Sequence, residues 1–232
     1  MPPVCIFCPA KATTKEHCIP KWMAKRVGLH GAFLDSVETT GRVIARKQPI
    51  SFKSHRKLLL CEGCQNHFKL LEDRVIPLFE ALESTASRSF SDDERMVLAQ
   101  WGLKTAICLI FAERGLEDLV PKEDRYELRE KGTLPTEAWI AFCAWDGTAG
   151  IAVNEYGSRL EGSDDPSPYA YSALLTTRRV GLKCVRLYGT SVSNTDLAFG
   201  GWRQAWPTQD VLFSWPPPFV FDDFDLLSAY LP

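Results

Sequence analysis

The chain has 232 residues, of which 45% are hydrophobic and 11% aromatic, so it is long and apolar enough to bury a sizeable core. Its net charge of −2 hides an asymmetry, because residues 1–60 hold eleven Lys or Arg against three acids. The N-terminal stretch MPPVCIFC has no signal-peptide pattern, and no apolar run reaches the ~20 residues of a membrane span. We therefore expect a folded globular protein in the cytoplasm, with no membrane partner.

The first predicted unit covers residues 1–75 and contains two Cys-x-x-Cys pairs. Between the pairs, residues 31–60 mix β-branched and apolar residues with Gly and Pro breaks, which predicts short strands. A helix is predicted from Gln65 to Glu83, with an interruption or bend near Pro77. Glu72 and Asp73, on this helix, are expected to cap it or to pair with Arg74.

The second predicted unit covers residues 76–232 and begins with the clearest helix, from Ser91 to Arg114. Ser91 and Glu94 have the spacing of a capping box, and Gly115 stands at a stop position. Most of the circumference of this helix is apolar between Val97 and Ala112, so it is expected to be a central buried helix.

From residue 138 the pattern changes to strands. AWIAFCAWDG, GIAVNEYG, YAYSALLTT and VGLKCVRLYG are apolar stretches separated by Gly, Asp and Pro turns, which favours a mainly antiparallel sheet. The Trp-, Phe- and Pro-rich tail after residue 205 is interpreted as irregular. The predicted fold class is therefore α+β in both units.

The paired cysteines predict a structural zinc site. In a reducing compartment paired cysteines bind metal more often than they form disulfides, and tetrahedral zinc takes four thiolates from two short knuckles. The predicted ligands are Cys5, Cys8, Cys61 and Cys64. The remaining cysteines are interpreted as small core residues: Cys18, Cys108, Cys143 and Cys184.

A zinc ion held in this way has a consequence for the residues between and after the pairs. It would bring Glu16 and His17 close to the first turn of the helix that carries Gln65, Asn66 and His67. A carboxylate, an imidazole and an amide would then share one small site.

The order of these motifs resembles the HNH endonucleases that have the zinc-binding ββα-metal fold. The matching pieces are C-x2-C, then Glu16-His17 followed by Pro20, then C-x2-C followed at once by Gln65 and Asn66. The resemblance covers about residues 4–75, a third of the chain. It implies a zinc-stapled ββα-metal unit over these residues, and the α+β domain predicted for residues 76–232 has no assigned role.

The resemblance also implies catalytic roles. A strand histidine is the general base in that family, which makes His17 the base that takes a proton from the attacking water. The preceding acid ligates a catalytic Mg²⁺ or Mn²⁺ ion, which suggests Glu16, and a helix residue completes the site, which suggests Asn66, with His67 as a further ligand. Because Gln65 directly follows the last cysteine where many members have Asn or His, either Gln65 or Asn66 can have this role.

These residue types suit the chemistry. Mg²⁺ and Mn²⁺ prefer oxygen ligands, and histidine titrates near neutrality, where a general base has to work. Basic side chains near the motifs are candidates for contact with phosphate, although each alone is more typical of an ordinary surface charge. The candidate contacts are Lys21, Lys25, Arg26, Arg56 and Lys57.

The leading hypothesis is a metal-dependent endonuclease that hydrolyses phosphodiester bonds in DNA, with RNA left open as a substrate. The alternative is a catalytically inactive, zinc-stabilised module that binds nucleic acid; it needs the cysteines and the basic residues but not Glu16 and His17. A zinc-folded scaffold for protein partners, with the Trp- and Pro-rich tail as contact surface, is a third hypothesis.

Overall fold

The fold is that of a computed structural model. It describes residues 3–26, 32–39, 42–51, 57–84, 86–112, 119–146, 152–159, 169–177, 179–187, 202–207, 213–217 and 220–221. Helices and antiparallel sheets are combined, so the predicted mixture of the two is confirmed.

Most strands belong to one large sheet. Along the chain, its strands are β2 (Ala32–Thr39), β3 (Arg42–Ser51), β6 (Ala138–Trp145), β7 (Ala152–Arg159), β8 (Tyr169–Thr176), β9 (Val180–Leu187), β10 (Trp202–Trp206) and β12 (Val220–Phe221). The hydrogen-bonded order is β10-β6-β9-β8-β7-β2-β3, with β12 also pairing with β6. Neighbours are antiparallel except for two parallel pairs, β2 with β7 and β12 with β6. The four strands predicted after residue 138 correspond to β6, β7, β8 and β9.

Two smaller strand pairs lie outside this sheet. β1 (Thr14–His17) pairs antiparallel with β4 (Lys57–Leu60), and β5 (Arg88–Phe90) pairs antiparallel with β11 (Phe213–Trp215). The tail was expected to be irregular, but β11 and β12 form in it because their backbones find partners far away in the sequence.

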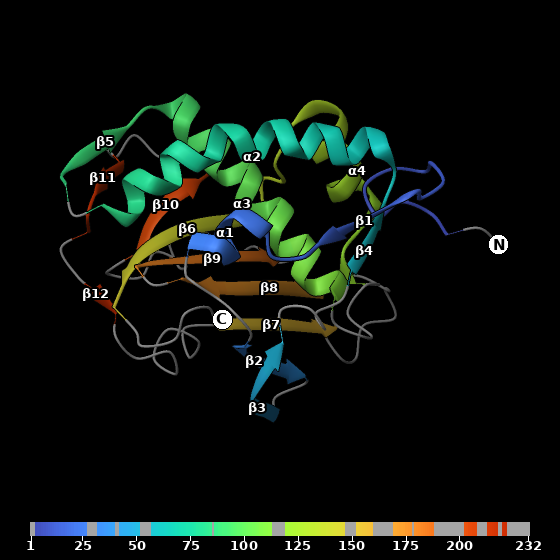
Figure 1. The fold of residues 1–232 in the computed structure, drawn as a ribbon, viewed down its shortest axis with the longest axis horizontal. Helices are drawn as coiled ribbons and strands as arrows, with labels where there is room; N and C mark the ends of the chain where they lie inside the picture. The colour runs from blue at the N-terminus through green and yellow to red at the C-terminus, as the bar shows by residue number, and fades with distance from the viewer. Residues whose placement is uncertain are drawn as a thin grey trace.

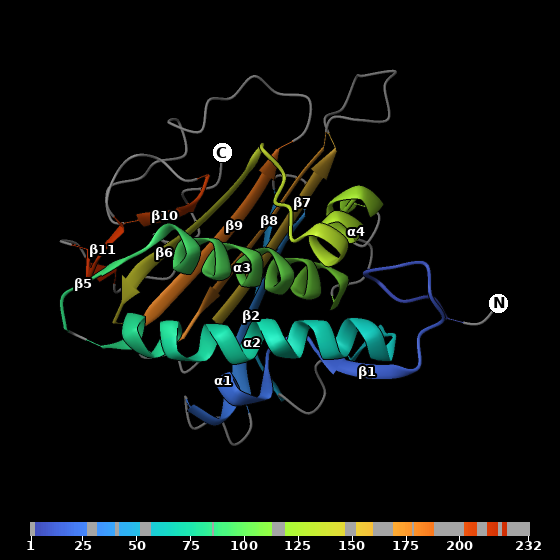
Figure 2. The ribbon, with the colours of Figure 1, turned by 90° about the horizontal axis from the view of Figure 1, so that it is seen from above.

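Two long helices form the layer above the sheet (Figures 1 and 2). α3 (Asp92–Ala112) contacts strands of the large sheet, and α2 (Glu62–Glu83) packs against α3. Figure 2 shows α2 between α3 and the short helix α1 (Lys21–Arg26), while α4 (Lys122–Lys131) lies beyond α3. β1 lies beside the beginning of α2 in both views.

α3 is the central buried helix that the sequence predicts. Its capping box is confirmed, because Ser91 Oγ accepts from the Glu94 N–H at 3.3 Å and Glu94 Oε2 accepts from the Ser91 N–H at 2.9 Å. The helix is long and apolar enough to cross a membrane, but 83% of its apolar window is buried inside the protein, as in the core helix of a soluble protein. A Cβ on Gly102 would lie 2.8 Å from Ile140 Cγ2, so a glycine is needed for this close approach to the sheet.

The predicted boundary near residue 75 falls inside α2, which continues through Pro77 as one 22-residue helix. One hydrophobic core contains residues from both predicted units, among them Phe7, Phe68 and Trp101. The insertion between β1 and β4 supplies β2 and β3 at the edge of the large sheet. The two units therefore share a core and a sheet.

Candidate metal centre and polar cavity

Four cysteine sulfurs converge at the beginning of α2. Cys5 and Cys8 precede β1, Cys61 is the N-cap of α2, and Cys64 lies in its first turn. The four Sγ atoms lie within 4.8 Å of one another, and Cys8 Sγ lies 3.5 Å from both Cys61 Sγ and Cys64 Sγ. Tetrahedral zinc with bonds of about 2.3 Å places its sulfur ligands about 3.8 Å apart. The donor set and its spacing fit zinc, so this cluster could hold a structural zinc ion.

The pKa values of three thiols of this cluster are shifted, and not all in the same direction. Burial works to raise the pKa of Cys61, but hydrogen bonds from the Cys64 backbone N–H and from neighbouring thiols outweigh it and lower the pKa to about 7. Burial raises the pKa of Cys8 and of Cys64. Crowded thiols cannot all ionise without a compensating cation, and a bound metal ion deprotonates its thiol ligands.

α4 supports both knuckles of the cluster from outside. Arg125, which is buried, donates a hydrogen bond to the carbonyl of Ile6, between the first two cysteines. Arg129 donates to the carbonyl of Gly63, between the last two, at 3.5 Å. The cluster is therefore held by residues from the far side of the predicted domain boundary.

A polar cavity of about 400 Å³ lies beside the beginning of α2. β4 ends immediately before Cys61, the N-cap of α2, so its partner β1 lies near the first turns of this helix. β1 ends with His17, which is opposite Lys57 in the strand pair. The lining residues come from β1, α1, α2 and α3: Lys15, Glu16, His17, Lys21, Trp22, Gln65, Asn66, Phe68, Lys69, Glu72 and Lys104. The structure thus brings together Glu16, His17 and both candidate amides.

The carboxylate of Glu16 is oriented by two donors. Glu16 Oε1 accepts from the His17 backbone N–H at 3.1 Å, and Glu16 Oε2 accepts from Gln65 Nε2 at 3.4 Å. Asn66 is exposed and lines the same cavity. The amide that contacts the acid is therefore that of Gln65, the residue directly after the last cysteine.

His67 lies elsewhere. It is not among the residues that line the polar cavity, and its ring packs edge-on against Phe68 with ring centroids 5.1 Å apart. Burial and the nearby charge of Arg129 lower its pKa. The cavity that brings the other candidate ligands together is therefore not lined by His67.

The candidate phosphate contacts have different surroundings in the structure. Lys21 lines the polar cavity, and Lys25 is exposed on α1. Arg26 is instead engaged by α2, with ion pairs to Glu80 at 2.6 Å and Glu83 at 3.2 Å. The backbone of Lys57 pairs with that of His17, and Arg56 lies outside the described residues.

Sequence reasoning missed one pair of cavity residues. Glu72 was expected to cap the helix or to pair with Arg74, but its carboxylate pairs with Lys104 Nζ on α3, at 2.8 Å. Residues two positions apart on a helix do not face each other, which disfavours the expected pair. A signal for the observed pair was present, since Lys104 is the one charged residue between Val97 and Ala112.

Lys104 keeps its charge although it is 1% exposed. Burial alone would lower its pKa, but the interactions with Cys108, Glu72 and Glu16 outweigh burial and raise the pKa above its usual range. The ammonium is therefore a buried positive charge in the lining of the polar cavity.

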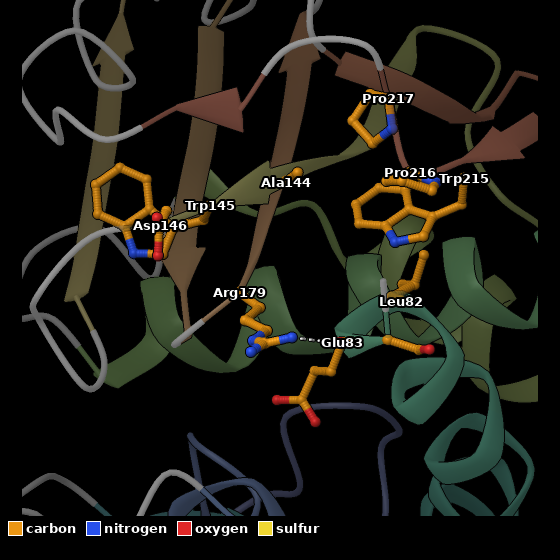
Figure 3. A pocket seen from close by; sticks show the side chains of 10 residues that line it. Leu82, Glu83, Ala144, Trp145, Asp146, Arg179, Trp215, Pro216 and Pro217 are labelled. Atoms are coloured by element: carbon orange, nitrogen blue, oxygen red, sulfur yellow. Dashed lines mark hydrogen bonds between the residues drawn. The ribbon is translucent and has the colours of Figure 1, made fainter. Parts of the chain in front are cut away.

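A second cavity, of about 340 Å³, lies at the other end of α2 (Figure 3). Trp145, Trp215 and Pro217 supply apolar walls, and Arg179 donates to the Glu83 carbonyl at 3.4 Å. Its composition differs from that of the polar cavity, and it contains none of the candidate residues from the sequence.

Comparisons with known proteins give no identity. No family model, no curated protein and no solved structure matches the chain. The cysteine cluster and the polar cavity therefore carry the functional argument alone.

Proposed function

We propose that the protein is a metal-dependent endonuclease that hydrolyses phosphodiester bonds in DNA. The observation that carries the proposal is the placement of Glu16 and His17 against Gln65 and Asn66 in one cavity, next to four cysteines suited to zinc. An antiparallel strand pair followed directly by a helix, here β1, β4 and α2, is the arrangement expected of a ββα-metal unit.

The reaction is an attack of water on the scissile phosphorus. His17 takes one proton from the water as its oxygen forms a bond to phosphorus, and the bond from phosphorus to the leaving sugar oxygen breaks. The leaving oxygen takes a proton from solvent. Glu16 and the amide oxygen of Asn66 would hold the divalent ion, while Gln65 donates to the Glu16 carboxylate.

The donor set fits Mg²⁺ or Mn²⁺. Mg²⁺ is commonly bound by one or two carboxylates together with substrate phosphates and water, so a single acid with amide neighbours is sufficient. When bound, such an ion neutralises charge on the phosphorane and on the leaving oxygen. Gln65 orients the Glu16 carboxylate for this purpose from the first turn of α2.

The charge of the cavity suits an anionic substrate. Four lysines line it against two glutamates: Lys15, Lys21, Lys69 and Lys104 against Glu16 and Glu72. Lys15, Lys21 and Lys69 are exposed, and exposed cations attract the phosphate backbone without reading its sequence. This charge also supports the alternative, a zinc-stabilised module that binds nucleic acid without cutting it.

A plasmid-nicking assay with Mg²⁺ or Mn²⁺ tests the proposal. We expect wild-type protein to nick plasmid, and His17→Ala to lower the rate by about 10²–10⁴-fold, the usual contribution of a general base. His67→Ala is the matched control, because this histidine lies outside the cavity, and it should cut like wild type. His17→Ala should keep wild-type zinc content and thermal unfolding.

Two outcomes would count against the nuclease. Plasmid binding without any cutting by wild type would favour the inactive binding module. Equal loss of activity in His17→Ala and His67→Ala would show that the effect is not specific to the proposed base.

A further inference from the structure

Lys104 occupies an unusual position for a lysine. It lies in the middle of α3, where the neighbouring positions Leu103, Thr105 and Ala106 are also buried. Removing an ammonium from water is unfavourable unless a partner compensates for the lost hydration. The Lys104 ammonium therefore needs nearby polar or negatively charged groups that compensate for its burial.

Lys104 lines the polar cavity together with its ion-pair partner. Its Nζ lies 2.8 Å from Glu72 Oε1 and 5.9 Å from the centre of the Phe68 ring, and all three residues line the cavity that contains Glu16 and His17. α3 thereby contributes a buried positive charge to a site whose other members come from β1, α1 and α2.

The hydrogen-bonding capacity of this ammonium is not exhausted. A lysine has three N–H donors. Within the described part of the chain, Lys104 donates a hydrogen bond to one acceptor, Glu72 Oε1. Lys104 is one of the residues that line a cavity of about 400 Å³, and lysines outnumber carboxylates among those residues.

We propose that Lys104 binds an anionic oxygen of the phosphate group on which the site acts; this inference rests on the proposed function. Lysine binds phosphate as a point charge, and the interaction is stronger in a partly desolvated cavity than in water. Because the pKa of Lys104 is raised, the charge persists through the whole range in which a histidine base titrates. Lys104 belongs to the site although it lies outside the stretch that resembles the nucleases.

Binding of inorganic phosphate tests this role without any cleavage. Calorimetric titration of wild-type, zinc-loaded protein should show saturable binding, and Lys104→Met should weaken it by about tenfold or more, as expected for the loss of a hydrogen bond to a charged group. Glu72→Gln keeps the ammonium and removes a negative charge, so it should bind phosphate at least as tightly as wild type. Lys131→Met is the matched control, because this lysine pairs with Glu127 on the surface of α4.

The double variant Lys104→Met/Glu72→Gln guards against misfolding, because it leaves no unpaired carboxylate. It should fold and still bind phosphate weakly, like Lys104→Met alone. Wild-type protein that binds no phosphate, or a folded double variant that binds it like wild type, would overturn the inference. A purely structural ion pair would instead give equal effects in Lys104→Met and Glu72→Gln.

Failure of this inference and failure of the nuclease can be told apart. If phosphate binding depends on Lys104 but the protein cuts no DNA, the role of Lys104 is supported and the proposed endonuclease activity is refuted. If the double variant cleaves DNA with an unchanged kcat/KM, the endonuclease activity is supported and the role of Lys104 is refuted.

Discussion

The two ends of α2 are built by different means. At its N-terminal end lie a cluster of four thiols and a polar cavity that is lined by Glu16 and several lysines. At its C-terminal end, Leu82 and Trp215 are each 1% exposed, and the cavity there has Trp and Pro walls. Polar groups and thiols therefore dominate one end, while buried apolar area dominates the other, where Arg26 adds ion pairs to Glu80 and Glu83.

The difference has consequences for what each end tolerates. Apolar contact is non-directional, so the C-terminal end gains stability wherever side chains such as Phe79 and Trp101 meet, with ring centroids 5.5 Å apart. Thiolates and carboxylates need specific partners at specific distances. The N-terminal end should consequently be sensitive to chelators and to single polar substitutions.

Loss of a zinc ligand is the largest expected effect. Cys64→Ala should lower zinc content and the free energy of unfolding, because structural zinc supplies on the order of 10 kcal/mol of folding free energy in small zinc domains. Cys18→Ala is a matched control, since Cys18 and Cys64 are both 1% exposed and only Cys64 belongs to the cluster. Elemental analysis of zinc and thermal unfolding would be measured together. Full zinc content in Cys64→Ala would contradict the four-cysteine site.

Loss of the support from α4 should have an intermediate effect. Arg125→Ala removes a buried guanidinium and leaves the Ile6 carbonyl without this donor, so it should cost about 1.5–3 kcal/mol of unfolding free energy. Arg129→Ala removes a longer and more exposed hydrogen bond, to Gly63, and should cost well below that. Urea unfolding measures both, and the rate of zinc release to a chelator should rise only in Arg125→Ala. Equal losses of unfolding free energy in the two variants would contradict the expectation that Arg125 stabilises the structure more than Arg129.

Local patterns predict one part of this molecule well. The Cys-x-x-Cys pairs and the capping box at Ser91 and Glu94 act over a few residues, so their residue types and spacing are sufficient to predict them. The burial of α3 follows from its composition, because a helix apolar on all sides has to be covered.

The rest of the structure depends on long-range packing, which those patterns do not contain. The parallel pairing of β2 with β7 joins residues more than a hundred positions apart. The Glu72–Lys104 pair depends on how α2 and α3 are rotated against each other. The choice between Gln65 and Asn66 depends on a helical step of ~100°, and only the position of β1 shows that Gln65 contacts Glu16.

The smallest expected effects are those of replacing Arg26 or Lys21, two cations of α1 that the sequence analysis treated alike as candidate phosphate contacts. Arg26 pairs with Glu80 and Glu83 at the C-terminal half of α2, whereas Lys21 lines the polar cavity. Arg26→Gln should cost about 0.5–1 kcal/mol, because partly exposed ion pairs contribute little. It should leave the salt dependence of DNA binding unchanged, while Lys21→Gln should reduce that slope by about one, as expected when one phosphate contact is lost. Fluorescence anisotropy across a salt series measures the slopes, and a reduced slope in Arg26→Gln would mean that DNA reaches the C-terminal half of α2 as well.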